Sequence, residues 1–142
     1  MTEQKLPPMY SLTAIGVATF LGSALAAGYM LASNYTALGR KQLGLYVLWG
    51  SIGIVAAFIF LPAQFVSNLP TAIVVMIGQV VLVLAISNKL QGAMFTSFES
   101  MGGKYHPMRR AVFVGIGASF VLTFAFALLA VMFGDPPAPV SP

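Results

Sequence analysis

Charged side chains are scarce in this 142-residue chain, which carries seven Lys and Arg against three Asp and Glu. Charged residues make up 7% of the sequence, whereas a soluble globular domain carries about 25%. So few charges cannot coat a water-soluble domain that is 58% hydrophobic. The composition therefore excludes a soluble enzyme and a nucleic-acid-binding module, and we expect no nucleic-acid partner.

Cysteine is absent, and the chain has one histidine, His106. A metal site needs several His, Cys or carboxylate ligands, which one loop histidine cannot supply. The sequence also lacks a Gly-rich phosphate loop and a convergent Ser–His–Asp set. We therefore expect no catalytic residue, no metal and no cofactor, and a protein that is not an enzyme.

Three long stretches, 6–39, 42–88 and 111–134, contain no charged residue. A helix needs about 20 mostly apolar residues to cross a bilayer. The middle stretch has room for two crossings, separated by a turn between Pro62 and Pro70. We predict an all-α membrane protein, a single domain over 1–134 with four transmembrane helices. The expected spans are 12–33, 44–61, 71–88 and 111–133.

The segments outside these spans are short. In the loop 89–110, Met94, Phe95, Phe98 and Met101 fall on one helical face, which predicts a short interfacial helix between the third and fourth spans. A docking helix for a cytoplasmic partner is the alternative. Residues 135–142 are Pro-rich and are expected to form a disordered tail.

The basic residues indicate an orientation. Four spans place both loops 34–43 and 89–110 on one side of the membrane, and both termini on the other. The loop side then holds every basic residue except Lys5, which the positive-inside rule assigns to the cytoplasm. We expect both termini to face outside. The residues expected to fix this topology and to meet lipid headgroups are Arg40, Lys41, Lys104, Arg109 and Arg110.

Small residues recur every four positions in the first and fourth spans, a spacing that lets two helix backbones approach closely. We expect these rows to form packing faces, within one chain or between subunits. Their members are Ala14, Ala18, Gly22, Ala26, Ala111, Gly115, Ser119 and Thr123.

Gln79 lies near the middle of the third span and is the most polar residue at membrane depth. We expect its amide to be bonded across a helix interface, with a pore or substrate contact as the alternative. No ionisable side chain lies within a span, which argues against an ion-coupled transporter.

The run from Ala18 to Tyr35, with Phe20-Leu21-Gly22 near its start and Asn34-Tyr35 at its end, is followed by Leu38-Gly39-Arg40. This pattern resembles the opening of a family of small uncharacterised polytopic bacterial membrane proteins. The resemblance implies a bacterial polytopic membrane protein of similar size and brings no activity. We accordingly expect the protein in the bacterial inner membrane. Within the pattern, Asn34 and Arg40 are candidates for a polar contact, or else for a helix cap and a topology anchor.

The sequence leaves three functions open. The first is a non-catalytic membrane protein that acts by helix association, as a homo-oligomer or as a subunit of a larger membrane complex. The second is a small oligomeric channel or carrier for a neutral or apolar solute. The third is an immunity-type protein against a membrane-acting toxin. The lipid bilayer is the one partner that all three share.

Overall fold

The computed structural model describes residues 6–59 and 68–133, and these ranges contain four helices. The helices are α1 (Leu12–Ala37), α2 (Lys41–Ile59), α3 (Leu69–Ser100) and α4 (Met108–Phe133). Counted from end to end, each is long and apolar enough to cross a membrane, which confirms the expected all-helical, multi-pass class. For α1 this length is counted across a break at Gly22–Ser23. The expected tail at 135–142 and most of the turn at 62–70 lie outside the described residues.

Short polar side chains and glycines set the helix ends. The Ser11 hydroxyl accepts the Ala14 N–H (3.2 Å) at the start of α1, and the Asn68 side chain accepts the Thr71 N–H (2.9 Å) at the start of α3. Beyond α1 and α3 the chain turns through Gly39 (φ +76°) and Gly102 (φ +72°), in the left-handed conformation that glycine adopts without steric cost.

Helix α3 has 32 residues, which at 1.5 Å per residue is about 48 Å, longer than the roughly 30 Å hydrocarbon core of a bilayer. Its last three turns carry part of the expected amphipathic pattern, with Phe95 and Phe98 buried and Thr96 and Ser97 exposed. Met101, which was expected on the same apolar face, is exposed in the turn beyond the helix. The structure therefore does not show a separate interfacial helix, because this segment continues α3 up to the turn at Gly102.

Helix α1 is broken in its middle. Gly22 (φ −131°, ψ 16°) and Ser23 (φ 64°, ψ −172°) are not helical, so α1 consists of two helical segments, 12–21 and 24–37. The chain reverses at this break. The Tyr10 N–H lies 2.7 Å from the Asn34 side-chain oxygen, whereas 22 residues of unbroken helix would separate Leu12 from Asn34 by about 33 Å.

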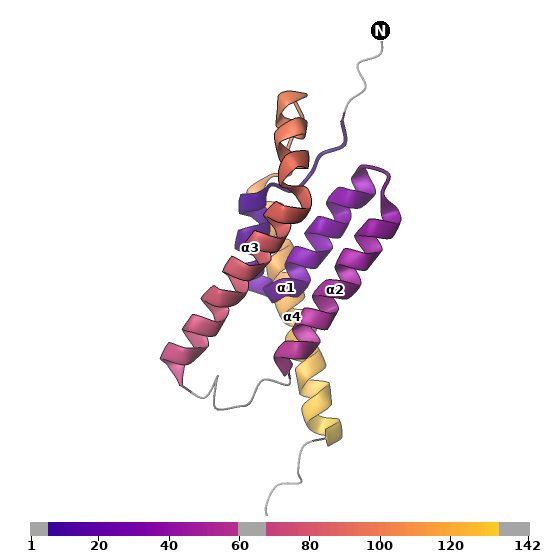
Figure 1. Cartoon of the computed structure of the whole chain (residues 1–142). Coiled ribbons are helices and arrows are strands. Elements are labelled where there is room, and N and C mark those ends of the chain that lie inside the picture. Colours follow the sequence, from indigo (N-terminus) through magenta and orange to yellow (C-terminus); the bar gives the residue numbers. More distant parts are fainter. Residues whose placement is uncertain (1–5, 60–67, 134–142) are drawn as a thin grey trace, which may run out of the picture.

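The reversal places the segment 6–11 beside Asn34, near the end of α1, and beside the turn 101–107. We call this end of the molecule, which also holds the turn 38–40, the loop end (Figure 1). The ends of α2 and α4 and the start of α3 lie toward the opposite, far end (Figure 1). From the sequence we expected the first helix to carry the N-terminal segment away from loop 34–43. That expectation is wrong, because the chain turns back at Gly22–Ser23.

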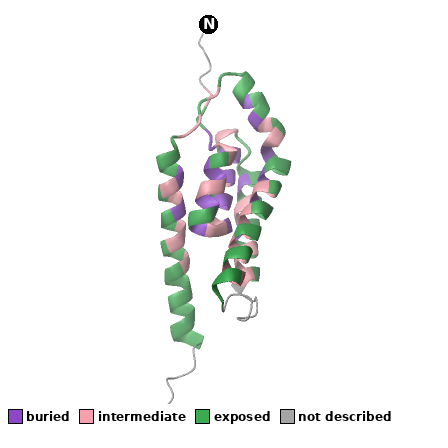
Figure 2. Ribbon diagram, turned by 90° about the vertical axis from the view of Figure 1, so that its left-hand side faces the viewer, coloured by how far each residue is buried: buried purple, intermediate pink, exposed green. Residues whose placement is uncertain are grey.

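Helix α1 is also the centre of the packing. It contacts α2, α3 and α4, and among the described residues no two of the other helices contact one another. Burial follows this arrangement, since buried residues concentrate on α1 and on the parts of the other helices beside it (Figure 2). Toward the far end, α4 is exposed from Thr123 to Phe133, and α3 has exposed and half-buried residues but no buried one before Val83 (Figure 2).

Candidate functional site

A network of buried amides joins three parts of the chain at the loop end. The Asn34 side chain accepts the Tyr10 N–H (2.7 Å) and donates to the Tyr10 carbonyl (3.0 Å) and to the Gln91 side-chain oxygen (3.1 Å). Gln91 in turn donates to the Leu31 carbonyl (3.1 Å). Asn34 and Gln91 are each 1% exposed. This amide network (Tyr10, Asn34, Gln91 and Leu31) ties the N-terminal segment to α1 and α3.

The N-terminal segment is also paired with the turn before α4. Met9 donates its N–H to the Lys104 carbonyl (3.3 Å) and accepts the His106 N–H (2.8 Å), as neighbouring parallel strands do. Met9 is fully buried. Together with the amide network, this pairing holds the segment 6–11 on two sides.

Aromatic and basic side chains surround the same place. The Tyr10 and His106 rings lie 4.6 Å apart, and the Arg110 guanidinium lies 5.9 Å from the Tyr10 ring centroid. An Arg110 nitrogen lies 3.2 Å from His106 Nδ1. Burial, and secondly the charge of Arg110, lower the pKa of His106 below its usual value. Nδ1 therefore accepts from Arg110, and the imidazole is neutral near pH 7.

The one described carboxylate at this end is Glu99. It accepts a hydrogen bond from the Tyr105 hydroxyl (3.0 Å). Burial, with that hydrogen bond next in size, raises the pKa of Tyr105 to about 12. Within the described ranges, no three His or acidic residues come close enough to hold a metal ion. The hydrogen-bonding groups at the loop end therefore join the N-terminal segment to α1, to α3 and to the turn before α4.

The predicted small-residue rows of α1 and α4 meet inside one chain. A Cβ on Gly22 would lie 2.2 Å from the Gly115 carbonyl oxygen, and a Cβ on Gly115 would lie 3.1 Å from the Ala18 oxygen. The Ser119 hydroxyl donates to the Leu21 carbonyl, which the break in α1 leaves free. The contact therefore lies at the tip of the α1 hairpin.

The remaining members of these rows divide between buried and exposed positions. Ala14, Ala26 and Ala111 are buried, and Thr123 is exposed beyond the contact. A second close approach joins α1 to α2, where a Cβ on Gly28 would lie 1.9 Å from the Ser51 hydroxyl and one on Gly44 would lie 2.8 Å from the Ala32 carbonyl. Neither glycine was among the predicted packing residues. Gly28 does belong to a four-residue row of small residues, with Ala24 and Ala32, whereas Gly44 has Arg40 and Leu48 four positions away.

The other candidates lie apart from the amide network. Gln79 is half-buried on α3, and its side chain makes no hydrogen bond to another described residue. Arg40 is exposed at the loop end, where its backbone N–H bonds the Tyr35 carbonyl (2.8 Å) and ends α1. The remaining basic candidates, Lys41, Lys104, Arg109 and Arg110, are also exposed at that end. Of the polar candidates, Asn34 is thus the one inside the network.

Gln91 is the functional residue that sequence reasoning missed. It lies in the segment expected to be a loop, where an amide is unremarkable. The available signal was its phase on a helix, since Val83, Ser87, Gln91, Phe95 and Phe98 fall on one face and are buried in the structure. Ser87 on that face is fully buried, and its hydroxyl has no hydrogen-bond partner among the described residues.

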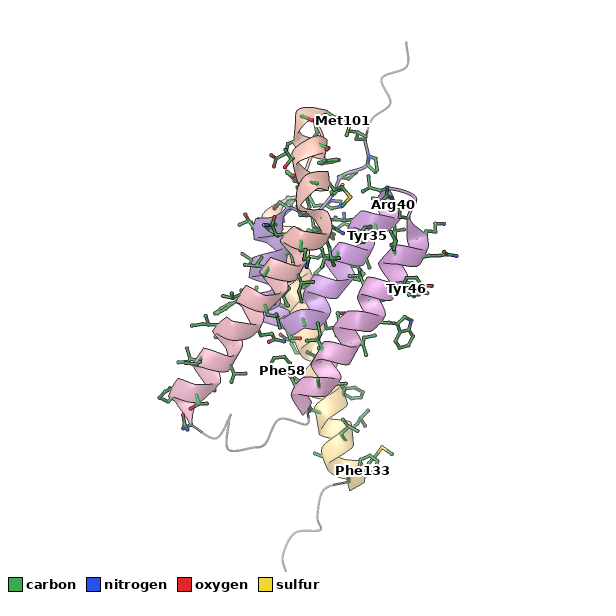
Figure 3. All side chains as sticks on the ribbon, viewed as in Figure 1. Tyr35, Arg40, Tyr46, Phe58, Met101 and Phe133 are labelled. Carbon is green, nitrogen blue, oxygen red and sulfur yellow. The ribbon has the colours of Figure 1, made fainter. Side chains whose placement is uncertain are left out.

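An apolar groove runs between α2 and α3, over the second half of α1. Its volume is about 380 Å³. Its floor is made by small side chains of α1, and a further hollow at the loop end, lined by Tyr35 and Arg40, continues it. Figure 3 shows Tyr35 and Arg40 at the end of the molecule that also holds Met101, with Phe133 at the other.

No protein-family model, no curated protein and no solved structure matches this chain. The resemblance seen in the first span therefore stays a sequence-based prediction.

Proposed function

We propose that this is a non-catalytic membrane protein that acts by association of its helices, as a homo-oligomer. The support comes from the far end, where α3 and α4 extend past the tip of the α1 hairpin. In the described part of the chain they contact no other helix there. Their exposed side chains are large, and Phe120 and Phe124 on α4 are 73% and 68% exposed. A second copy of the chain would cover these faces.

Gln79 is the observation that carries the proposal. It stands ten residues into α3, about 15 Å from its start and so near the bilayer centre. An amide facing hydrocarbon is costly, and polar side chains at this depth are normally bonded across a helix interface. Because none of the described residues bonds Gln79, a partner helix from another copy is the source of that bond.

We further propose that the loop end faces the cytoplasm of a bacterial inner membrane. All six basic residues in the described ranges lie at or near this end, as the positive-inside rule requires. Neither segment of α1 is long enough to cross, so α1 forms a re-entrant hairpin and α2, α3 and α4 cross. The N-terminal segment then lies inside and the C-terminus outside. A C-terminal reporter that is active only in the cytoplasm should stay silent.

The oligomer is tested with Gln79→Leu, which removes the amide and keeps the size. We expect the subunit contact to weaken by about 1 kcal/mol, measured as the dissociation of labelled subunits on dilution in lipid vesicles. Gln79→Asn keeps an amide and should retain most of the association. Val74→Leu, on an exposed part of the same helix, is the apolar control.

Two outcomes would contradict the proposal. One is a wild-type chain that remains monomeric at every ratio of protein to lipid. The other is a Gln79→Leu variant that associates as tightly as wild type. Unchanged folding of the variant, followed by circular dichroism, separates a loss of association from a loss of structure.

A carrier for an apolar solute is the second candidate, favoured by the groove between α2 and α3. The geometry of the oligomer distinguishes the two functions. A ring of subunits with Gln79 lining a polar path supports transport, and a dry apolar interface supports association alone.

A further inference from the structure

We propose that the groove between α2 and α3 is a binding site for an anionic glycerophospholipid, with an acyl chain in the groove and the phosphate at Arg40. The proposal needs the chain to be embedded in a membrane, and it does not depend on the oligomer. It rests on the shape of the groove, its length and the charge at its mouth.

The groove is a product of how the helices pack. α2 and α3 both contact α1 and do not contact each other within the described ranges, so a channel remains between them. Ala24, Ala27 and Gly28 form part of its floor, and their small side chains leave it open. Its volume of about 380 Å³ is within the range of ligand sites, which starts near 300 Å³. Its lining is almost entirely apolar, so it suits a hydrocarbon chain.

The length of the groove matches one leaflet. Along α1 it extends from Ala24 to Tyr35, which is eleven residues, or about 16 Å of helix. Half of a hydrocarbon core of roughly 30 Å is about 15 Å. An acyl chain that starts at the loop end would therefore reach the tip of the α1 hairpin and end there.

The mouth of the groove adds a basic and a polar side chain to a largely apolar lining. The hollow that continues it shares Tyr35, Leu43 and Leu90 with the groove and adds Arg40 and Ser97. Arg40 makes no ion pair with Glu99, which is the one described carboxylate and accepts a hydrogen bond from Tyr105. A guanidinium is the side chain best suited to hold a phosphate by two hydrogen bonds. This charge, placed where an acyl groove opens, selects a phospholipid over an uncharged apolar molecule.

Two glycines on α2 give a matched test. A Cβ on Gly50 would meet nothing within 4 Å, and so would one on Gly53, but only Gly50 lines the groove. Gly50→Phe fills the groove from a site with free space, and Gly53→Phe adds the same side chain outside it. The experiment counts phosphatidylglycerol molecules retained by the detergent-purified full chain, using native mass spectrometry during a titration.

We expect wild type and Gly53→Phe to bind one phosphatidylglycerol per chain with equal affinity. Gly50→Phe should bind about tenfold more weakly, because each methylene kept out of the groove loses its burial. Gly50→Leu and Gly50→Ala should give intermediate losses in order of size, which keeps the test valid if the Phe variant folds poorly. Equal binding by the Gly50 and Gly53 series would overturn the proposal.

Arg40 is tested separately from the groove. Arg40→Gln should remove the preference for phosphatidylglycerol over phosphatidylethanolamine, whereas Arg109→Gln, also exposed at the loop end, should leave it unchanged. Inorganic phosphate should not displace the lipid, since the acyl chain supplies most of the contact. Displacement by phosphate alone, or an unchanged preference in Arg40→Gln, would contradict the assigned headgroup.

Discussion

The two ends of this molecule are built from similarly apolar helices and are held together very differently. At the loop end, the α1 hairpin fills the space between α2, α3 and α4, and the chain adds a buried amide network and a short strand pairing. At the far end, α1 is missing and α3 and α4 contact no other helix within the described ranges.

This difference shows that apolar composition alone does not bring membrane helices together. Helices surrounded by lipid gain little from hydrophobic burial, so close backbone contacts and hydrogen bonds supply the attraction. The loop end has both kinds of contact, at Gly22–Gly115 and at Asn34. The far end has Gln79 as a polar group at membrane depth, and its side chain makes no hydrogen bond to another described residue.

The largest loss of folding stability is expected from Asn34→Leu, which breaks the amide network. The change leaves the Tyr10 N–H, the Tyr10 carbonyl and the Gln91 side-chain oxygen buried without a partner. Each such group costs roughly 1–3 kcal/mol, so the free energy of unfolding should fall by about 4 kcal/mol. An SDS titration followed by circular dichroism measures this. Gln42→Leu, which removes an exposed amide at the same end, should cost almost nothing.

Next in size is Gly115→Leu, which pushes α4 away from the hairpin tip. The new Cβ would lie 2.8 Å from the Leu21 Cβ and 3.1 Å from the Ala18 carbonyl oxygen. We expect a loss of about 3 kcal/mol, measured by the same titration. Gly117→Leu is the control two residues along, where a Cβ would meet nothing within 4 Å. Equal losses in the two variants would mean that this contact does not hold α4.

At the reversal in α1, we expect a smaller change that raises the free energy of unfolding. Ser23 has φ 64° and ψ −172°, a conformation that side chains other than glycine rarely adopt. Ser23→Gly should therefore raise the free energy of unfolding by about 1 kcal/mol. Ser33→Gly, inside the second helical segment of α1, should instead lower it by about 1 kcal/mol. A destabilised Ser23→Gly variant would contradict the strained conformation at Ser23, since loss of the bond from the Leu25 N–H to the Ser23 hydroxyl (3.4 Å) should cost only roughly a few tenths of a kcal/mol.

The smallest effect concerns pH at the loop end. Burial and Arg110 lower the pKa of His106 in the folded chain, so the unfolded chain binds the proton more readily. The contribution of His106 to the free energy of unfolding is therefore fully present above its unfolded pKa of about 6.5 and is lost as the pH falls below that value. Hydrogen exchange at Met9 and His106 should accelerate on acidification, and less so in His106→Gln. Exchange is corrected for its intrinsic rate before the comparison. If the corrected rates do not depend on pH in wild type or in His106→Gln, the expected role of His106 is contradicted.

Much of the fold was predictable from residue types and their spacing. The uncharged stretches gave the helices, and the small-residue rows identified Gly22 and Gly115, which meet in the structure. The reversal in α1 was missed because Gly22 and Ser23 read equally well as packing residues inside one span. The available clue was length, since the stretch 6–39 has 34 residues and one crossing needs about 20.

One member of the amide network could be predicted from the sequence, and its partners could not. Asn34 stood out as a polar residue near the end of an apolar run, but its partners are set by tertiary structure. Tyr10 reaches it because the chain turns back, and Gln91 reaches it because α3 runs on past the expected span. Neither fact follows from local helix propensity or from hydropathy.

The central claim is that α1 turns back and keeps the N-terminal segment at the loop end. Because the chain has no cysteine, single Cys residues can be placed at the exposed positions Pro8, Gln42 and Leu69 and labelled with a membrane-impermeant maleimide. The account predicts that Pro8→Cys and Gln42→Cys react only from the cytoplasmic side and Leu69→Cys only from outside. Reaction of Pro8→Cys from the same side as Leu69→Cys would contradict it.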